Sequence, residues 1–174
     1  MKRGRLALVF GFGCAWLAVG ALAADTAPQP VNPVGRWAEY EMLLQTDQPL
    51  RGTLRQVYID KISWRTARLT KQLPYGSKIV ARDFEAVPDS KGGWKLVNGH
   101  LVPGKQTTVL IQQKEKGWGT THPEDIRTGE WEFAIFTAAG EPIPVNPEKD
   151  CMPCHKQVVA TDYNFQVSRF LAER

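Results

Sequence analysis

The sequence has few residues that bind metals or form cross-links: three cysteines, three methionines and three histidines among 174 residues. Cys14 lies in an apolar N-terminal leader, so a chain cut behind that leader keeps only Cys151 and Cys154. Two neighbouring cysteines provide no disulfide framework, and a bridge between them would close a very short, strained loop. A structural zinc site needs four ligands, and no second cysteine pair or histidine pair completes one.

An excess of charge of one sign is also missing behind the leader. Lysine and arginine number 22 against 18 acidic residues, but Lys2, Arg3 and Arg5 lie in a leader that has no acidic residue. The nearly neutral remainder gives no support to a nucleic-acid-binding face, which needs clustered basic residues. A composition of 43% hydrophobic and 23% charged residues, without internal repeats, is typical of one globular domain.

Residues 1–24 have the order of a secretory signal peptide: a basic start, an apolar stretch and small residues before the cut. We expect cleavage after Ala23 or Ala24. An uncleaved leader that anchors the chain is the alternative, because the apolar stretch is about long enough to span a bilayer. The proline-containing residues 25–34 predict an extended or flexible linker, and the folded domain is expected over residues 35–174.

The strongest motif is Cys151-Met152-Pro153-Cys154-His155, which has the C-x-x-C-H spacing of c-type haem attachment. Thiols at i and i+3 can each form a thioether with one vinyl group of a porphyrin, and His155 is then held beneath the iron as its ligand. The second ring nitrogen of His155 should donate to a carbonyl or a carboxylate. Haem attachment outside the cytoplasm agrees with the leader, so the sequence predicts a periplasmic protein that carries one covalent haem c.

Short runs rich in β-branched and aromatic residues predict an α+β domain with an antiparallel sheet and the haem attached near the C-terminus. A helix is expected near residues 61–72 and another around the haem motif. The predicted strands are Thr53 to Asp60, Ser77 to Val87, Gln106 to Gln113 and Glu130 to Thr137. This pattern argues against a four-helix bundle, and the C-terminal motif argues against the common electron-carrier cytochromes, whose motif lies near the N-terminus.

Three segments of the chain resemble the cytochrome P-460 family, which includes the beta-sheet cytochromes c-prime-beta. Residues 73–80, LPYGSKIV, are similar to the family's P-x-G-S/T-x-I/L-V strand start. Residues 117–119 with 131–133 carry a second similarity. The most specific segment is the haem motif followed by Asp162-Tyr163-Asn164-Phe165, in which Asn164 replaces the family's usual valine. The resemblance covers residues 37–165.

This resemblance implies a β-sheet domain, often homodimeric, with a five-coordinate c-type haem that binds a small nitrogenous ligand. Some members bind nitric oxide under aromatic residues, and others oxidise hydroxylamine and carry a link from a lysine to the porphyrin. Lys78, in the matching strand, is the first candidate for such a link, and Lys71 and Lys91 are weaker ones. A soluble redox partner is also expected.

The residues on the open side of the iron decide between binding and turnover. His122, Glu132 or Glu130 is a candidate general base for hydroxylamine oxidation. Further candidates near the haem are the polar His100 and Arg127 and the aromatic Phe84, Trp131, Phe133 and Phe136.

Two functions of other classes stay open at this point. A six-coordinate electron-transfer protein would need Met42, His100 or His122 as the second iron ligand, since Met152 lies inside the motif. A thiol redox or structural site without haem would use Cys151 and Cys154 directly. That reading is disfavoured because a redox-active dithiol is expected at the start of a helix in an α/β pattern, which this sequence does not have.

Overall fold

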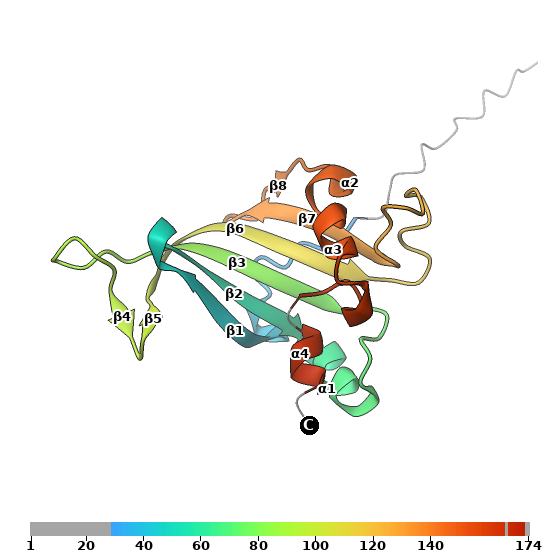
Figure 1. Cartoon of the computed structure of the whole chain (residues 1–174), viewed down its shortest axis with the longest axis horizontal. Coiled ribbons are helices and arrows are strands. Elements are labelled where there is room, and N and C mark those ends of the chain that lie inside the picture. The colour runs from blue at the N-terminus through green and yellow to red at the C-terminus, as the bar shows by residue number, and fades with distance from the viewer. Residues whose placement is uncertain (1–28, 166, 173–174) are drawn as a thin grey trace, which may run out of the picture.

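The computed structural model describes residues 29–165 and 167–172, and its main feature is one antiparallel sheet (Figure 1). The sheet has six strands in the order β1-β2-β3-β6-β7-β8, and β4 and β5 form a separate hairpin. The strands are β1 (Tyr40–Gln48), β2 (Thr53–Asp60), β3 (Lys78–Ala86), β4 (Leu96–Val97), β5 (His100–Leu101), β6 (Pro103–Lys114), β7 (Trp131–Thr137) and β8 (Pro142–Ile143). The helices are α1 (Lys61–Thr70), α2 (Pro147–Asp150), α3 (Met152–Lys156) and α4 (Val167–Ala172). The fold is therefore α+β, as the sequence predicts.

The predicted strands and the first helix are confirmed to within a few residues. The strand over Thr53–Asp60 agrees at both ends, and the helix expected over residues 61–72 is α1. Asp60 fixes the start of α1, because its buried side chain accepts a hydrogen bond from the backbone N of Ser63 at 2.8 Å. The same carboxylate accepts from the backbone N of Lys78 at 2.8 Å and so ties the start of β3 to α1.

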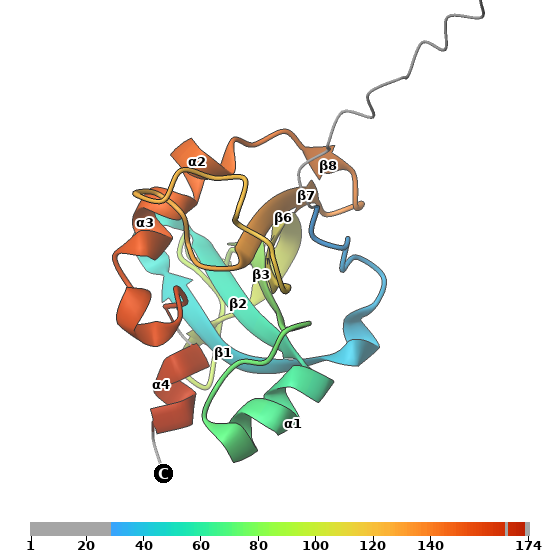
Figure 2. The same cartoon turned by 90° about the vertical axis from the view of Figure 1, so that its right-hand side faces the viewer.

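Each face of the sheet carries its own hydrophobic core, and the C-terminal helices cover one face only. Figure 2 shows α3 and α4 on one side of the strands and the N-terminal segment on the other. The core on the helix side includes Val57, Ile79, Phe133 and Met152. The opposite core is formed by Tyr40, Val80, Val109, Ile111, Ala134 and Phe136. Alternate residues of each strand therefore serve opposite cores, as the two-residue period of a strand requires.

Residues 29–34, within the segment predicted as a linker, lie against the domain. Pro30 and Pro33 are buried. The backbone N of Val31 donates to Oε1 of Gln113 at 2.9 Å, and Nδ2 of Asn32 donates to the carbonyl of Gly140 at 2.8 Å. The predicted signal peptide, residues 1–24, lies outside the described residues. Within the part of the chain that the structure describes, every helix is too short or too polar to cross a membrane.

Candidate functional site

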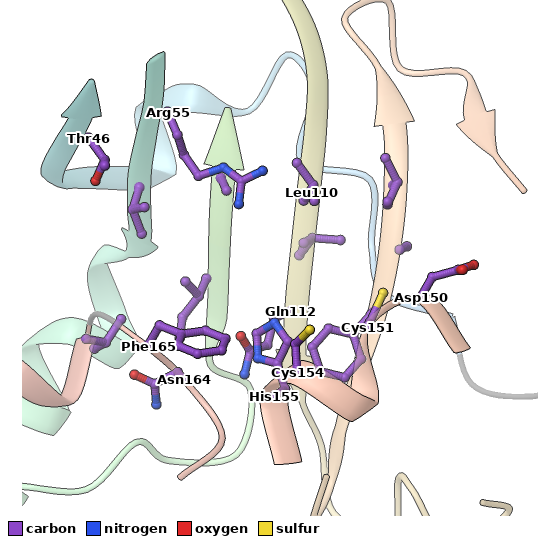
Figure 3. A pocket seen from close by; sticks show the side chains of 18 of the residues that line it. Thr46, Arg55, Leu110, Gln112, Asp150, Cys151, Cys154, His155, Asn164 and Phe165 are labelled. Atoms are coloured by element: carbon purple, nitrogen blue, oxygen red, sulfur yellow. The ribbon is translucent and has the colours of Figure 1, made fainter. Parts of the chain in front are cut away.

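A cavity of about 450 Å³ lies between the helix-side face of the sheet and the C-terminal segment (Figure 3). The sheet contributes mostly apolar side chains, among them Val57, Ala81, Leu110 and Ile135. These four residues face one another across β2, β3, β6 and β7 and form one continuous row. The C-terminal segment contributes Asp150, Cys151, Cys154, His155, Asn164, Phe165 and Val167.

The two cysteines reach the cavity because a helical turn begins at the first of them. Pro147 starts α2, and Asn146 caps it by accepting a hydrogen bond from the backbone N of Glu148 at 3.1 Å. The chain then turns at Cys151, whose carbonyl accepts from the backbone N of His155 at 3.2 Å. Cys151, Cys154 and His155 therefore share one turn that faces the cavity.

Both thiols are free, and the environment of Cys151 does not suit thiol redox chemistry. Cys151 is half-buried and Cys154 is exposed. Burial, with smaller contributions from Asp150 and Cys154, raises the pKa of the Cys151 thiol to about 11. Reactive thiols need a lowered pKa, since the thiolate is the nucleophile. The dithiol hypothesis thus loses support, whereas thioether attachment agrees with the position of both sulfurs.

The imidazole of His155 is held so that one of its nitrogens is free. Nδ1 lies 2.7 Å from the carbonyl oxygen of Tyr163, and a carbonyl only accepts, so Nδ1 carries the proton and Nε2 is left as an acceptor. Phe133 and Phe165 pack against the ring, with centroid distances of 4.7 and 5.0 Å. Burial, together with the positive charge of Arg55, lowers the pKa of His155. A neutral imidazole with a free nitrogen is the form that binds a metal.

The carbonyl of Tyr163 also accepts from Nε2 of Gln112 at 3.0 Å. The turn that presents this carbonyl is unusual, since Asp162 and Tyr163 both have positive φ, 54° and 59°. Such a backbone persists only where its surroundings hold it. The Asp162 carboxylate accepts from Lys114 Nζ at 2.8 Å and from Trp131 Nε1 at 3.2 Å.

Each residue of the D-Y-N-F segment therefore has a role around His155. Asp162 anchors the turn, Tyr163 supplies the acceptor, and Phe165 packs against the imidazole. The ring of Tyr163 lies over Gly129, where an added Cβ would come within 2.8 Å of it. Asn164 is buried, lines the cavity and closes the turn with a 2.7 Å hydrogen bond from Nδ2 to the carbonyl of Thr161.

Three of the residues considered for catalysis, Lys78, His122 and Glu132, are absent from the cavity lining. Lys78 points to the other side of β3 from Ile79 and Ala81, and its ammonium donates to the carbonyl of Gly76 at 3.0 Å. His122, which is half-buried, and Glu132, which is buried, form a pair, with Nε2 of His122 2.7 Å from Oε1 of Glu132. The structure brings these two residues together, but beside α2 rather than over His155.

The remaining candidates also occupy other places. Met42 is exposed and lines a second cavity, which Lys71 also lines. Lys91 lies in an exposed turn. Nδ1 of His100 lies 3.0 Å from an Asp47 oxygen. Of the aromatic candidates, Phe133 lines the cavity, whereas Phe84, Trp131 and Phe136 are core residues away from it. Arg127 lies in the loop before β7, and Glu130 is the last residue of that loop. Both are likewise absent from the lining.

Two residues of the site, Gln112 and Arg55, were not predicted from the sequence. Both belong to predicted strands, but a lone glutamine or arginine in a strand gives no signal of its own. The alternation within β2 and β6 would have shown that both face the same side as Val57 and Leu110.

The residues present fit a haem. Two thiols and an imidazole, whose Nε2 has no hydrogen-bond partner among the described residues, converge on a cavity that is otherwise mainly apolar, and Phe165 is 51% exposed beside it. A large apolar group bound there would cover that ring. The antiparallel sheet with this cysteine–histidine turn at its face defines a c-type cytochrome.

Comparison with protein-family models places the chain more narrowly. The model described as Cytochrome P460 matches residues 35–166, and the chain therefore belongs to that family. Comparison with the curated proteins gives no match.

Proposed function

We propose that this chain is a periplasmic cytochrome whose single haem is bound covalently through Cys151 and Cys154, and that it binds nitric oxide at an open face of the iron. The bound haem would supply an iron atom able to take a diatomic gas as its sixth ligand. His155 would hold the iron through Nε2. The Tyr163 carbonyl would fix the imidazole by accepting from Nδ1, and Gln112 would fix that carbonyl by donating to it.

One observation carries this proposal: His155 is the only histidine among the described residues that line the cavity, and no methionine lines it. Met42, His100 and His122, which a six-coordinate electron carrier would need, all lie elsewhere. A haem held here would find one protein ligand, His155, among the described residues of the lining. Its iron would then be able to bind a small molecule as well.

The same lining favours gas binding over hydroxylamine oxidation. No lysine is among the described residues around the cavity, so none is in place to form the link to the porphyrin. The row formed by Val57, Ala81, Leu110 and Ile135 offers no base and creates an apolar environment. Such an environment suits a neutral diatomic ligand.

The first experiment uses full-length protein matured in a bacterial periplasm. We expect haem that stays bound after denaturation, a mass consistent with one haem and a cleaved leader, and a high-spin spectrum that changes when nitric oxide is added to the reduced protein. A low-spin spectrum that ignores the gas would contradict the open iron face. A strongly red-shifted Soret band with hydroxylamine turnover would instead indicate the lysine link. The homodimer and the redox partner stay predictions, which gel filtration and reduction kinetics can check.

A further inference from the structure

A row of polar side chains crosses the sheet on the cavity side, at the end away from His155. Thr46, Arg55, Asp83 and Thr108 face one another in register on β1, β2, β3 and β6. Thr46 and Arg55 line the cavity. Figure 3 shows Arg55 and His155 at opposite ends of it.

The guanidinium of Arg55 is held in a fixed position. Nε donates to one Asp83 oxygen at 2.6 Å and Nη2 donates to the other at 2.8 Å. The hydroxyl of Thr108 donates to the second oxygen at 3.2 Å, which further anchors the carboxylate. Among residues 29–165 and 167–172, Asp83 is the only hydrogen-bond partner of this guanidinium, so Nη1 keeps both of its N–H groups for another acceptor.

Arg55 and His155 face each other across an apolar gap. Gln112, which holds the acceptor of His155, lies four residues beyond Thr108 on β6, or about 13 Å along the strand. The row containing Ala81 and Leu110 lies between them.

We propose that Arg55 recognises a small planar oxyanion, of the kind represented by nitrite or formate, on the open side of the cavity. This proposal rests on the proposed function, since it places the anion between Arg55 and the face of the haem opposite His155. A guanidinium fork matches the oxygens of such an anion, and hydrogen bonds between charged partners are stronger than those between neutral ones. Because Asp83 neutralises the charge of Arg55, the site selects its ligand by hydrogen bonding more than by net charge.

The test measures nitrite and formate dissociation constants by titrating the Soret band of oxidised, haem-loaded full-length protein. We expect R55Q to weaken both at least about tenfold, and R55K to lie between R55Q and the unmodified chain. D83N should leave anion affinity unchanged or raise it, because it leaves the Arg55 charge without its counter-ion. A merely structural ion pair would make R55Q and D83N behave alike, and that result would overturn the proposal.

Two controls use the same samples. Arg82 lies on the opposite face of the sheet, with its guanidinium 4.2 Å from the centre of the Trp37 ring, so R82Q should leave anion affinity unchanged. Imidazole and nitric oxide are neutral probes, and their affinities should change less than threefold in R55Q. Melting temperatures of all variants show which of them are folded.

The outcomes separate this proposal from the one on which it rests. If the reduced unmodified protein fails to bind nitric oxide, the proposed function is wrong. If nitric oxide binds but nitrite affinity is equal in all variants, only the Arg55 proposal is overturned. An unchanged nitrite affinity together with a shifted midpoint potential in R55Q would assign the guanidinium to a carboxylate of the porphyrin itself, and would also overturn the proposal.

Discussion

At the scale of single residues, the most informative atom is the carbonyl oxygen of Tyr163. It accepts from Nδ1 of His155 and from Nε2 of Gln112, at 2.7 and 3.0 Å. The second hydrogen bond fixes the direction in which the carbonyl points, and the carbonyl in turn fixes the imidazole. Gln112 is therefore a positioning residue, which acts on the proposed iron ligand His155 through the Tyr163 carbonyl.

Replacing Gln112 with leucine keeps the size of the side chain and removes this donor. We expect Q112L to lose about 1 kcal/mol of unfolding free energy. We also expect it to shift the iron–histidine stretching frequency of the reduced protein, measured by resonance Raman spectroscopy. Gln113, whose side chain bonds Glu115 and Val31, is the matched control, and Q113L should leave this frequency unchanged. Equal frequencies in Q112L and the unmodified chain would show that Gln112 has no part in holding His155.

At the scale of elements, the short helix α2 is tied to the sheet by a half-buried histidine, His122. His122 lies 2.7 Å from a Glu132 oxygen on β7 and 2.9 Å from a Glu148 oxygen on α2. Burial lowers the pKa of His122, but the hydrogen bonds and charges of Glu148 and Glu132 outweigh it and leave the pKa raised. Burial also raises the pKa of Glu132. The folded protein thus holds a proton here more tightly than the unfolded chain does.

This linkage predicts that alkaline pH weakens the fold. A raised pKa in the folded state means that the stabilisation is fully present below pH 6.5, the ordinary value for histidine, and is lost as the pH rises through the raised value. We expect a loss of about 1–2 kcal/mol in the free energy of unfolding between pH 6 and pH 9, measured by denaturant titration. H122Q should flatten this dependence.

His100 provides the control, because its side chain is 63% exposed and also lies beside a carboxylate, that of Asp47. H100Q should keep the pH dependence of the unmodified protein. A slope in H122Q as steep as that of the unmodified chain would assign the titration to another group.

The pattern of residue types along the chain predicts some elements of this fold and misses others. The strands β2 and β7 alternate or carry β-branched and aromatic residues, and both were predicted. The strand β1 was missed, because it pairs only with β2 at the edge of the sheet and its many polar residues match its exposure. The C-x-x-C-H motif predicted Cys151, Cys154 and His155 as haem-binding residues from its local spacing, and the structure places all three in the cavity lining.

The roles of Lys78, His122 and Glu132 depend on contacts between distant segments. Lys78 shares a strand with Ala81 but faces the other way, a difference that follows from strand register rather than from residue type. His122 has its partners ten and twenty-six residues away, and only the folded chain brings them together.

At the scale of the whole molecule, the cavity lies between the sheet and part of the C-terminal segment that covers it. The C-terminal segment packs on the sheet through Met152, Val167 and Leu171, which belong to one core, and Val167 also lines the cavity. A bound haem would complete this layer and stabilise the fold, because folding would bury apolar surface of both the porphyrin and the cavity.

We therefore expect the double variant C151A/C154A to lose covalent haem and to melt on the order of 10 °C lower, measured by circular dichroism. Each single variant keeps one thiol, so C151A and C154A should retain bound haem and most of the melting temperature. A double variant that melts together with the unmodified chain would show that the haem contributes nothing to the fold.

The hydrogen bond of His155 to the main chain also limits how this site can vary. Because the acceptor is a backbone carbonyl, no substitution of the Tyr163 side chain removes it directly. Variation among related chains can alter the bond only by reshaping the turn at Asp162 and Tyr163 or by changing Gln112. The electronic properties of the iron would then depend on the conformation of this turn, whereas residues on the open side of the cavity could change without altering them.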